Sequence, residues 1–372
     1  MTEIDRRSLL VALAAFGLGV RPRAAAAGDD ASRWVAARFD RGDVATLALF
    51  DAAGRERAAT DLPGRAHDTV VSPDGRLLVV VARRPGSFAL VLDAGTLAPL
   101  GRLTPPAGLH FTGHGRFSAD GRRFFTGEND VAADQGVVGV HDVAAGFARI
   151  GERRSGGTGP HDVALSPDGR RLIVANGGIG TDPTTGRDRV NRETMRPNLA
   201  VLDLGGGDPI AVTDLGPDLR LSSIRHLAVA ADGEVVFGCQ FEGDAADSPL
   251  LVGSWRPDGA APPRLWEMPD SALARLADYV GSVALDASGR FVAASSPRGG
   301  SVAFFERASG RFLGLEAMAD VCGLAAGGAD GVFLATSGAA GVRRLAPGRR
   351  PEGGGFGGLG DHVWDNHVTR IG

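Results

Sequence analysis

The chain has 372 residues, enough for two domains or one large repeat fold, and its 40 basic and 44 acidic residues give a net charge of −4. All the basic residues are arginine, which excludes a Schiff-base or phosphate-loop lysine, and the lack of a basic block argues against a nucleic-acid partner. The 56 glycines favour many short strands joined by tight turns.

Residues 1–27 have the features of an export signal. The pair Arg6-Arg7 precedes a short apolar stretch at 9–20 and a run of alanines that ends at Ala27. The apolar stretch is too short for a permanent membrane helix, and the arginine pair points to the twin-arginine pathway. We therefore expect a mature protein of residues 28–372 in the periplasm, without a stable membrane span after cleavage. An uncleaved membrane anchor is the alternative.

The chain repeats a strand–turn–strand unit. The string HDTVVSPDG at 67–75 matches HDVALSPDG at 161–169, and weaker copies surround Gly121, Gly233, Gly289 and Gly331. The turn glycines recur at intervals of 42 to 64 residues, and a period in the forties with a strand–Asp-Gly–strand core is typical of β-propeller blades. Asp-Gly supplies positive φ at a two-residue turn, so the apolar runs on either side fold back as a hairpin.

Six units begin with an inner strand, and each is predicted to have four strands. In the unit that begins at His161 these are 163–165, 171–175, 199–203 and 211–215. The segment before the six units has only three strands, at 34–39, 45–50 and 57–62, and the missing one is predicted at 367–371. The fold class is therefore all-β: a monomeric, single-domain seven-bladed propeller, closed by a C-terminal strand that completes the N-terminal blade and leaves no open edge.

The two cysteines, Cys239 and Cys322, fall in different blades. We expect two separate buried thiols rather than a disulfide. The sequence has no Cys-x-x-Cys-His run, so covalently attached haem is not expected.

Histidines gather just before the inner strands, and inner strands of a propeller start near its central channel. Two of them lie eight residues before the turn glycine, two lie one residue later, and one opens the closing strand. The candidate binding residues at this mouth of the channel are His67, Asp68, His114, His161, Asp162, Arg225, His226 and His367.

Convergent imidazoles could hold iron, copper or zinc, because histidine is the commonest transition-metal ligand. The candidate ligands are His67, His161, His226 and His367. Asp68 and Asp162 would act as acceptors that orient the rings. The alternative is a structural role, in which each ring bonds neighbouring backbone and fixes its blade.

The longest interval between turn glycines contains an arginine-rich insertion at 177–197. Long insertions in repeat folds crown one face and often bind ligands. Arg187, Arg192 and Arg196 are candidates for holding a carboxylate, a phosphate or a siderophore-like anion. The alternative is a solvated loop whose arginines pair with its own acidic residues.

The string GPHDVALSPDG at 159–169 looks like the YVTN-type propeller repeat. The chain also resembles a family of exported bacterial propellers defined only by a domain of unknown function. The resemblance rests on VANGGI at 174–179, RHLAV at 225–229, YVGSVA at 279–284, VCGLA at 321–325 and WDNH at 364–367. Members of that family are often encoded beside imelysin-type proteins, so the resemblance implies a periplasmic role among iron-uptake proteins. It implies no catalytic residues.

Three functions remain open at this point. A binding or scaffold propeller in iron acquisition needs only the histidine-bearing mouth and the loop at 177–197. A metal-dependent, lactonase-like hydrolase is the second, because propellers of this repeat type can be lactonases. A redox protein with a metal at the propeller mouth is the third, because twin-arginine export carries proteins that have already folded, and a cofactor acquired in the cytoplasm is one reason to use it.

Overall fold

The repeat unit reverses direction at a Ser-Pro-Asp-Gly turn. The carbonyl oxygen of Ser72 accepts the N–H of Gly75 at 2.8 Å, and Gly75 has a φ of 71°, which glycine adopts without strain. The Asp74 carboxylate accepts the Ser72 hydroxyl at 2.6 Å and fixes the turn from within. The turns at Gly121 and Gly169 contain the same backbone hydrogen bond. The positive φ predicted at the glycine is confirmed, but glycine is the last of four turn residues rather than the second of two.

The computed structural model describes residues 32–40, 43–83, 88–181, 191–349, 356, 359 and 362–371, all within the compact unit Ser32–Gly372. The segment predicted as an export signal, 1–27, and the predicted ligand Arg187 lie outside the described residues. The described strands form seven antiparallel sheets, here called blades 1 to 7 and given from the inner to the outer strand.

Blade 1 contains β27 (Val363–Ile371), β1 (Arg33–Asp40), β2 (Val44–Asp51) and β3 (Glu56–Asp61). Blade 2 contains β4 (Ala66–Val71), β5 (Leu77–Ala82), β6 (Ala89–Asp93) and β7 (Pro99–Leu103). Blade 3 contains β8 (Leu109–Phe117), β9 (Arg123–Asp130), β10 (Gln135–Asp142) and β11 (Ala148–Arg154). Blade 4 contains β12 (Pro160–Leu165), β13 (Arg171–Asn176), β14 (Asn198–Asp203) and β15 (Ala211–Thr213).

Blade 5 contains β16 (Ser222–Val229), β17 (Val235–Phe241), β18 (Val252–Trp255) and β19 (Arg264–Leu265). Blade 6 contains β20 (Ser282–Leu285), β21 (Phe291–Ser296), β22 (Ser301–Glu306) and β23 (Arg311–Ala317). Blade 7 contains β24 (Val321–Ala326), β25 (Phe333–Ser337) and β26 (Gly341–Leu345). The fourth strand expected in blade 7 falls on a segment that is largely outside the described residues.

The described helical segments are short and lie between strands. They are α1 (Asp270–Leu273) and the 3₁₀ turns η2 (Arg192–Thr194), η3 (Pro217–Leu219) and η4 (Ala274–Leu276). None of the helices in the described part of the chain has the length and apolar character needed to cross a membrane.

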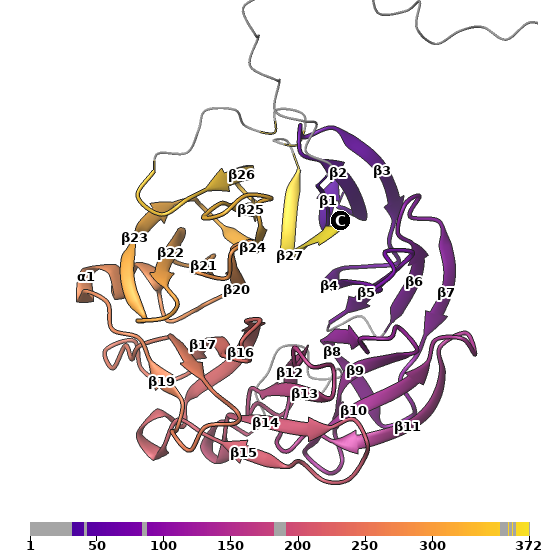
Figure 1. Cartoon of the computed structure of the whole chain (residues 1–372), viewed down its shortest axis with the longest axis horizontal. Coiled ribbons are helices and arrows are strands. Elements are labelled where there is room, and N and C mark those ends of the chain that lie inside the picture. Colours follow the sequence, from indigo (N-terminus) through magenta and orange to yellow (C-terminus); the bar gives the residue numbers. More distant parts are fainter. Residues whose placement is uncertain are drawn as a thin grey trace, which may run out of the picture. The chain divides into compact units, whose positions relative to one another are not determined.

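The blades form a closed ring, in agreement with the predicted seven-bladed propeller (Figure 1). Each inner strand contacts the inner strand of the next blade, and β24 of blade 7 contacts β27 of blade 1. The composite first blade is confirmed, because β27 pairs antiparallel with β1 from Arg33 opposite Ile371 to Phe39 opposite Val363. The first and last parts of the described chain therefore share one sheet.

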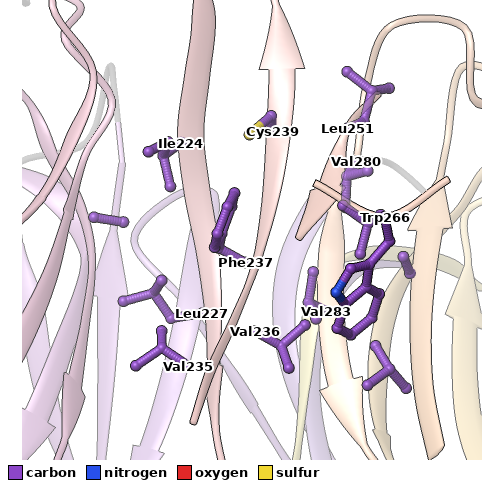
Figure 2. Packing of buried hydrophobic residues seen from close by; sticks show 14 of the residues in the cluster. Ile224, Leu227, Val235, Val236, Phe237, Cys239, Leu251, Trp266, Val280 and Val283 are labelled. Atoms are coloured by element: carbon purple, nitrogen blue, oxygen red, sulfur yellow. The ribbon is translucent and has the colours of Figure 1, made fainter. Parts of the chain in front are cut away.

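Apolar side chains between neighbouring blades form the core. Figure 2 shows part of one cluster, in which Phe237 and Trp266 of blade 5 and Val283 of blade 6 are buried. Strand β17 is buried along its whole length, because blades cover both of its faces. Cys239 lies in this cluster, and both it and Cys322 are buried free thiols, as predicted.

Candidate functional site

The predicted cluster of histidines comes together around the propeller axis. The five rings come from the inner strands of five consecutive blades: His367 from β27, His67 from β4, His114 from β8, His161 from β12 and His226 from β16. We call this group the five-histidine cluster. The four rings from blades 2 to 5 are 5% exposed or less, and the His367 ring from blade 1 is partly buried. The sequence placed these rings at a mouth of the channel, and the structure buries them.

A β-bulge directs side chains from the inner strands toward the axis. The pairing register shifts at His67 in blade 2, at His161 in blade 4 and at Arg225 in blade 5. A bulged residue has no partner across the ladder, so its side chain is free to turn away from the sheet. The following aspartates, Asp68 and Asp162, accept the next backbone N–H at 2.8 and 2.7 Å and stabilise the irregular backbone.

Four of the rings form a circuit and the fifth contacts all of them. The ring centroids are 5.7 Å apart for His67 and His161, 4.8 Å for His161 and His226, 5.0 Å for His226 and His367, and 4.9 Å for His367 and His67. The His114 ring lies 4.8 to 5.8 Å from each of the four. The four rings of the circuit are those predicted as metal ligands, and His114 contacts all four of them.

Two buried aspartates orient His114. Its Nδ1 lies 3.1 Å from Oδ2 of Asp68 and 3.5 Å from Oδ1 of Asp162, so Nδ1–H donates to carboxylate oxygen and Nε2 faces the other rings. Oδ2 of Asp162 also accepts the backbone N–H of Leu227 at 2.9 Å, which joins blades 4 and 5. The two aspartates thus orient a ring, as predicted, but the ring is His114 rather than one of the predicted ligands.

Each ring of the cluster keeps a buried nitrogen that has no hydrogen-bond partner among the described residues. These atoms are Nε2 of His67, His114, His161 and His367 and both nitrogens of His226. A buried polar atom without a partner costs about 1–3 kcal/mol. Several such nitrogens in one cluster therefore destabilise the fold, unless the cluster binds a ligand that pairs with them.

Charge in the cluster is set by burial and by the aspartates. Burial, reinforced by neighbouring positive charge, lowers the pKa of the four circuit rings, to about 4 for His367. Burial also disfavours the charged form of His114, but Asp162 and Asp68 outweigh it and raise the pKa of this ring. Four imidazoles held in the neutral form, which is the form that binds metal ions, therefore surround His114.

A cavity of about 370 Å³ adjoins the five-histidine cluster. Residues of six blades line it, which places it on the propeller axis, and His67 and His161 belong to both the cavity and the cluster. Its charged lining consists of Arg65, Arg83, Arg225 and Arg298, and none of its described lining residues is an aspartate or glutamate. The cavity therefore presents a positive wall.

Acidic residues behind the wall hold two of these arginines. Asp365 accepts two hydrogen bonds from Arg65, at 2.7 and 2.6 Å, and Glu242 lies 3.6 Å from Arg225. On the other side, the Arg298 guanidinium stacks over the Tyr279 ring at 5.0 Å. These contacts hold three of the four guanidinium groups in place at the cavity wall.

The described part of the loop at 177–197 reaches the cavity through residues other than its arginines. Gly177, Ile179 and Thr181 line the cavity, whereas the exposed Arg192 and Arg196 do not. Among the described arginines predicted for binding, Arg225 alone reaches the cavity.

Sequence reasoning missed Arg65, Arg83 and Arg298. Arg83 follows β5 and Arg298 lies two residues after β21. The loop at 177–197 begins at the corresponding place after β13. Alignment of the ends of the second strands, rather than of the turn glycines, would have revealed a second ring of residues on the same face.

The comparisons place this architecture in a family. A family model described as "Protein of unknown function (DUF1513)" matches residues 60–371. The chain belongs to the DUF1513 family. The matched segment contains every residue of the five-histidine cluster and of the cavity wall. A comparison of the DUF1513 chain with curated proteins gives no match.

Solved structures share the fold of the DUF1513 chain. Hydrazine synthase of Kuenenia stuttgartiensis is 14% identical with a TM-score of 0.62, and the match covers 82% of this chain and 90% of that one. The periplasmic gluconolactonase of Pseudomonas aeruginosa is 18% identical with a TM-score of 0.61, covering 92% and 99%. At these identities the likeness concerns the propeller fold alone.

Proposed function

We propose that this protein is an exported binding propeller whose axial cavity takes up a small anion with several negative charges. The observation that carries the proposal is the cavity wall, in which four arginines and no carboxylate side chain appear among the described lining residues. A volume of about 370 Å³ suits a small molecule rather than a peptide. Polycarboxylates and phosphates are the ligand classes that rigid arginine pairs recognise.

The family resemblance noted in the sequence supports iron as part of the bound ligand. A ferric complex of a polycarboxylate carries the negative charge that the wall favours, and it would connect the protein with iron-uptake partners. Free citrate, ferric citrate and phosphate therefore separate the ligand classes. The iron link is supported if ferric citrate binds more tightly than citrate, and it is set aside if the two bind equally.

Binding is expected to depend on the cavity arginines. In calorimetric titrations with citrate, Arg83→Gln and Arg298→Gln should each weaken the affinity at least about tenfold, because a hydrogen bond to a charged group contributes roughly 1.5–3 kcal/mol. Arg122→Gln is the matched control, since this exposed arginine lies at the opposite end of β8 from the cavity-lining residues of that strand. Equal affinities for the parent and both cavity variants would refute an arginine-lined anion site.

Hydrolysis of a lactone is the second candidate, because ring nitrogens of His67 and His161 adjoin the cavity and could take a proton from water. The similar fold of a gluconolactonase makes gluconolactone the natural probe. Turnover that disappears in His161→Ala would replace the binding proposal by a hydrolase. Binding of the anions without turnover of the lactone supports a binding protein.

Export to the periplasm by the twin-arginine pathway is part of the proposal. Replacing Arg6 and Arg7 together by alanine should retain the precursor in the cytoplasm, because the translocase reads the arginine pair rather than charge alone. Immunoblots of periplasmic and cytoplasmic fractions provide the measurement, with the exposed Arg122→Gln variant as the control. Normal periplasmic levels of the double variant would point to the general secretory route instead.

A further inference from the structure

We propose that the five-histidine cluster binds one divalent transition-metal ion, with copper(II) as the preferred metal. This site goes beyond the proposed anion binding, because it uses the imidazoles around His114 rather than the arginines of the cavity wall. It also differs from the ligand set predicted from the sequence, since His114 becomes the central ligand.

The first support is geometric. Ligand atoms of His67, His114 and His161 lie within 4.8 Å of one another, and so do those of His114, His226 and His367. Nitrogens bound at about 2.0–2.1 Å to one metal lie roughly 3 Å apart, so side-chain shifts of roughly 1 Å would close the set. His114 belongs to both triads, and because its Nδ1 is engaged by Asp68, Nε2 is the one nitrogen left for a metal, so the triads would share one ion.

The second support is the hydrogen bonding of His114, the ligand that both triads share. A metal-bound histidine usually donates its other ring N–H to a carboxylate, which fixes the ring and raises its basicity. His114 makes this contact with Asp68 and Asp162. Both aspartates are buried, so a divalent ion would find two compensating negative charges directly behind its ligand.

The contact between His67 and Asn366 sets His67 apart from the other candidate ligands. Its Nδ1 lies 2.9 Å from Nδ2 of Asn366, whose Oδ1 accepts a hydrogen bond from Arg65 at 3.1 Å. With this amide orientation the neutral ring carries its proton on Nε2, so metal binding by His67 requires the amide to turn. We therefore assign His114, His226 and His367 as the primary ligands, joined by His161, and His67 as the fifth after rotation of Asn366.

The metal preference follows from the ligand types. The candidate ligands are all imidazole nitrogens, and the two thiols, Cys239 and Cys322, belong to neither triad. Imidazole is a ligand that copper(II), nickel(II) and zinc(II) all accept. Copper(II) stands above nickel and zinc in the affinity order of divalent ions.

The experiment uses untagged protein, because a histidine tag would itself bind copper. Chelator-stripped protein is titrated with copper(II), nickel(II) and zinc(II) in a non-coordinating buffer, and the copper form is examined by electron paramagnetic resonance. We expect one copper per chain, hyperfine splitting from three or more nitrogens, and affinity at least 100-fold lower in His114→Ala. His362→Ala is the control, because His362 is partly exposed and pairs with Asp40 at 2.8 Å, away from the cluster.

Two results would overturn the proposal. One is a copper signal in the parent protein without nitrogen splitting from several imidazoles, which is independent of how any variant folds. The other is unchanged copper affinity in a folded His114→Ala protein. Citrate binding is measured separately on the metal-free parent, so failure of the metal site leaves the anion proposal intact, and failure of anion binding leaves the metal proposal intact.

Discussion

A protein without residues 363–371 is expected to lose its folded ring. These residues form β27, which pairs with β1 and buries the side chains of Trp364, Val368 and Ile371. Burial of one such side chain contributes about 1.5–3 kcal/mol, so the three together approach the roughly 5–15 kcal/mol by which folded domains are stable. The deletion also exposes the edge of β1, which favours aggregation.

Circular dichroism and thermal unfolding of the shortened chain measure this loss. A synthetic peptide of residues 363–371 should restore part of the folded signal, because it supplies the missing strand. The control is Val363→Thr, which changes an exposed side chain of the same strand and should shift the melting temperature by no more than about two degrees. A shortened chain that melts within about two degrees of the parent would contradict the closure of blade 1 by β27.

The substitution Glu128→Ala is expected to destabilise the protein by about 3 kcal/mol. The Glu128 carboxylate is fully buried in blade 3 and accepts hydrogen bonds from Arg149 at 2.7 Å and from the Thr126 hydroxyl at 2.6 Å. Removing one partner of a buried ion pair costs about 3–5 kcal/mol, and the value belongs at the lower end because Arg149 reaches solvent. Urea unfolding of parent and variant at neutral pH provides the measurement.

A control and a pH series sharpen this test. Glu152 is the other partner of Arg149 but is 58% exposed, so Glu152→Ala should change stability by less than about 1 kcal/mol.

Burial raises the pKa of Glu128, but His141, Arg149 and Thr126 outweigh it and lower the pKa below the ordinary value of 4.5. The stabilisation is therefore complete above the unfolded-state pKa and is lost as the pH falls through the lowered folded-state pKa. An energy difference that persists unchanged at pH 2 would show that the loss comes from packing rather than from charge.

The architecture could be predicted because it depends on local patterns. Asp-Gly turns and apolar runs mark the inner hairpins of five blades, and the count of three strands at 34–62 requires a fourth from elsewhere, which is β27. The convergence of the histidines follows from the same repeat, since they fall at neighbouring positions on the inner strands, which surround the axis. Equivalent positions in a ring must lie together, whatever their distance along the chain.

The details of the site depend on contacts between blades, which no local pattern contains. His114 aligns one residue away from His67 and His161, so the repeat gives no sign that it contacts all four other rings. Its two aspartate partners come from blades 2 and 4, on either side of its own blade. Arg83 and Arg298 follow the second strands of their blades, where neither the turns nor the histidines draw attention to them.

The order in which the strands leave the ribosome has a consequence for when this protein can act. Blades 2 to 7 can form as their residues are synthesised, but β27 carries His367, Asn366 and Asp365 and comes last among the described strands. Until it arrives, the circuit of rings lacks a member and Arg65 lacks the carboxylate that positions it. A copy without β27 would therefore lack one ring of the five-histidine cluster and the carboxylate that fixes one arginine of the cavity wall. Both features are complete only once β27 has paired with β1, so the last strand to be made finishes the centre of the ring as well as its edge.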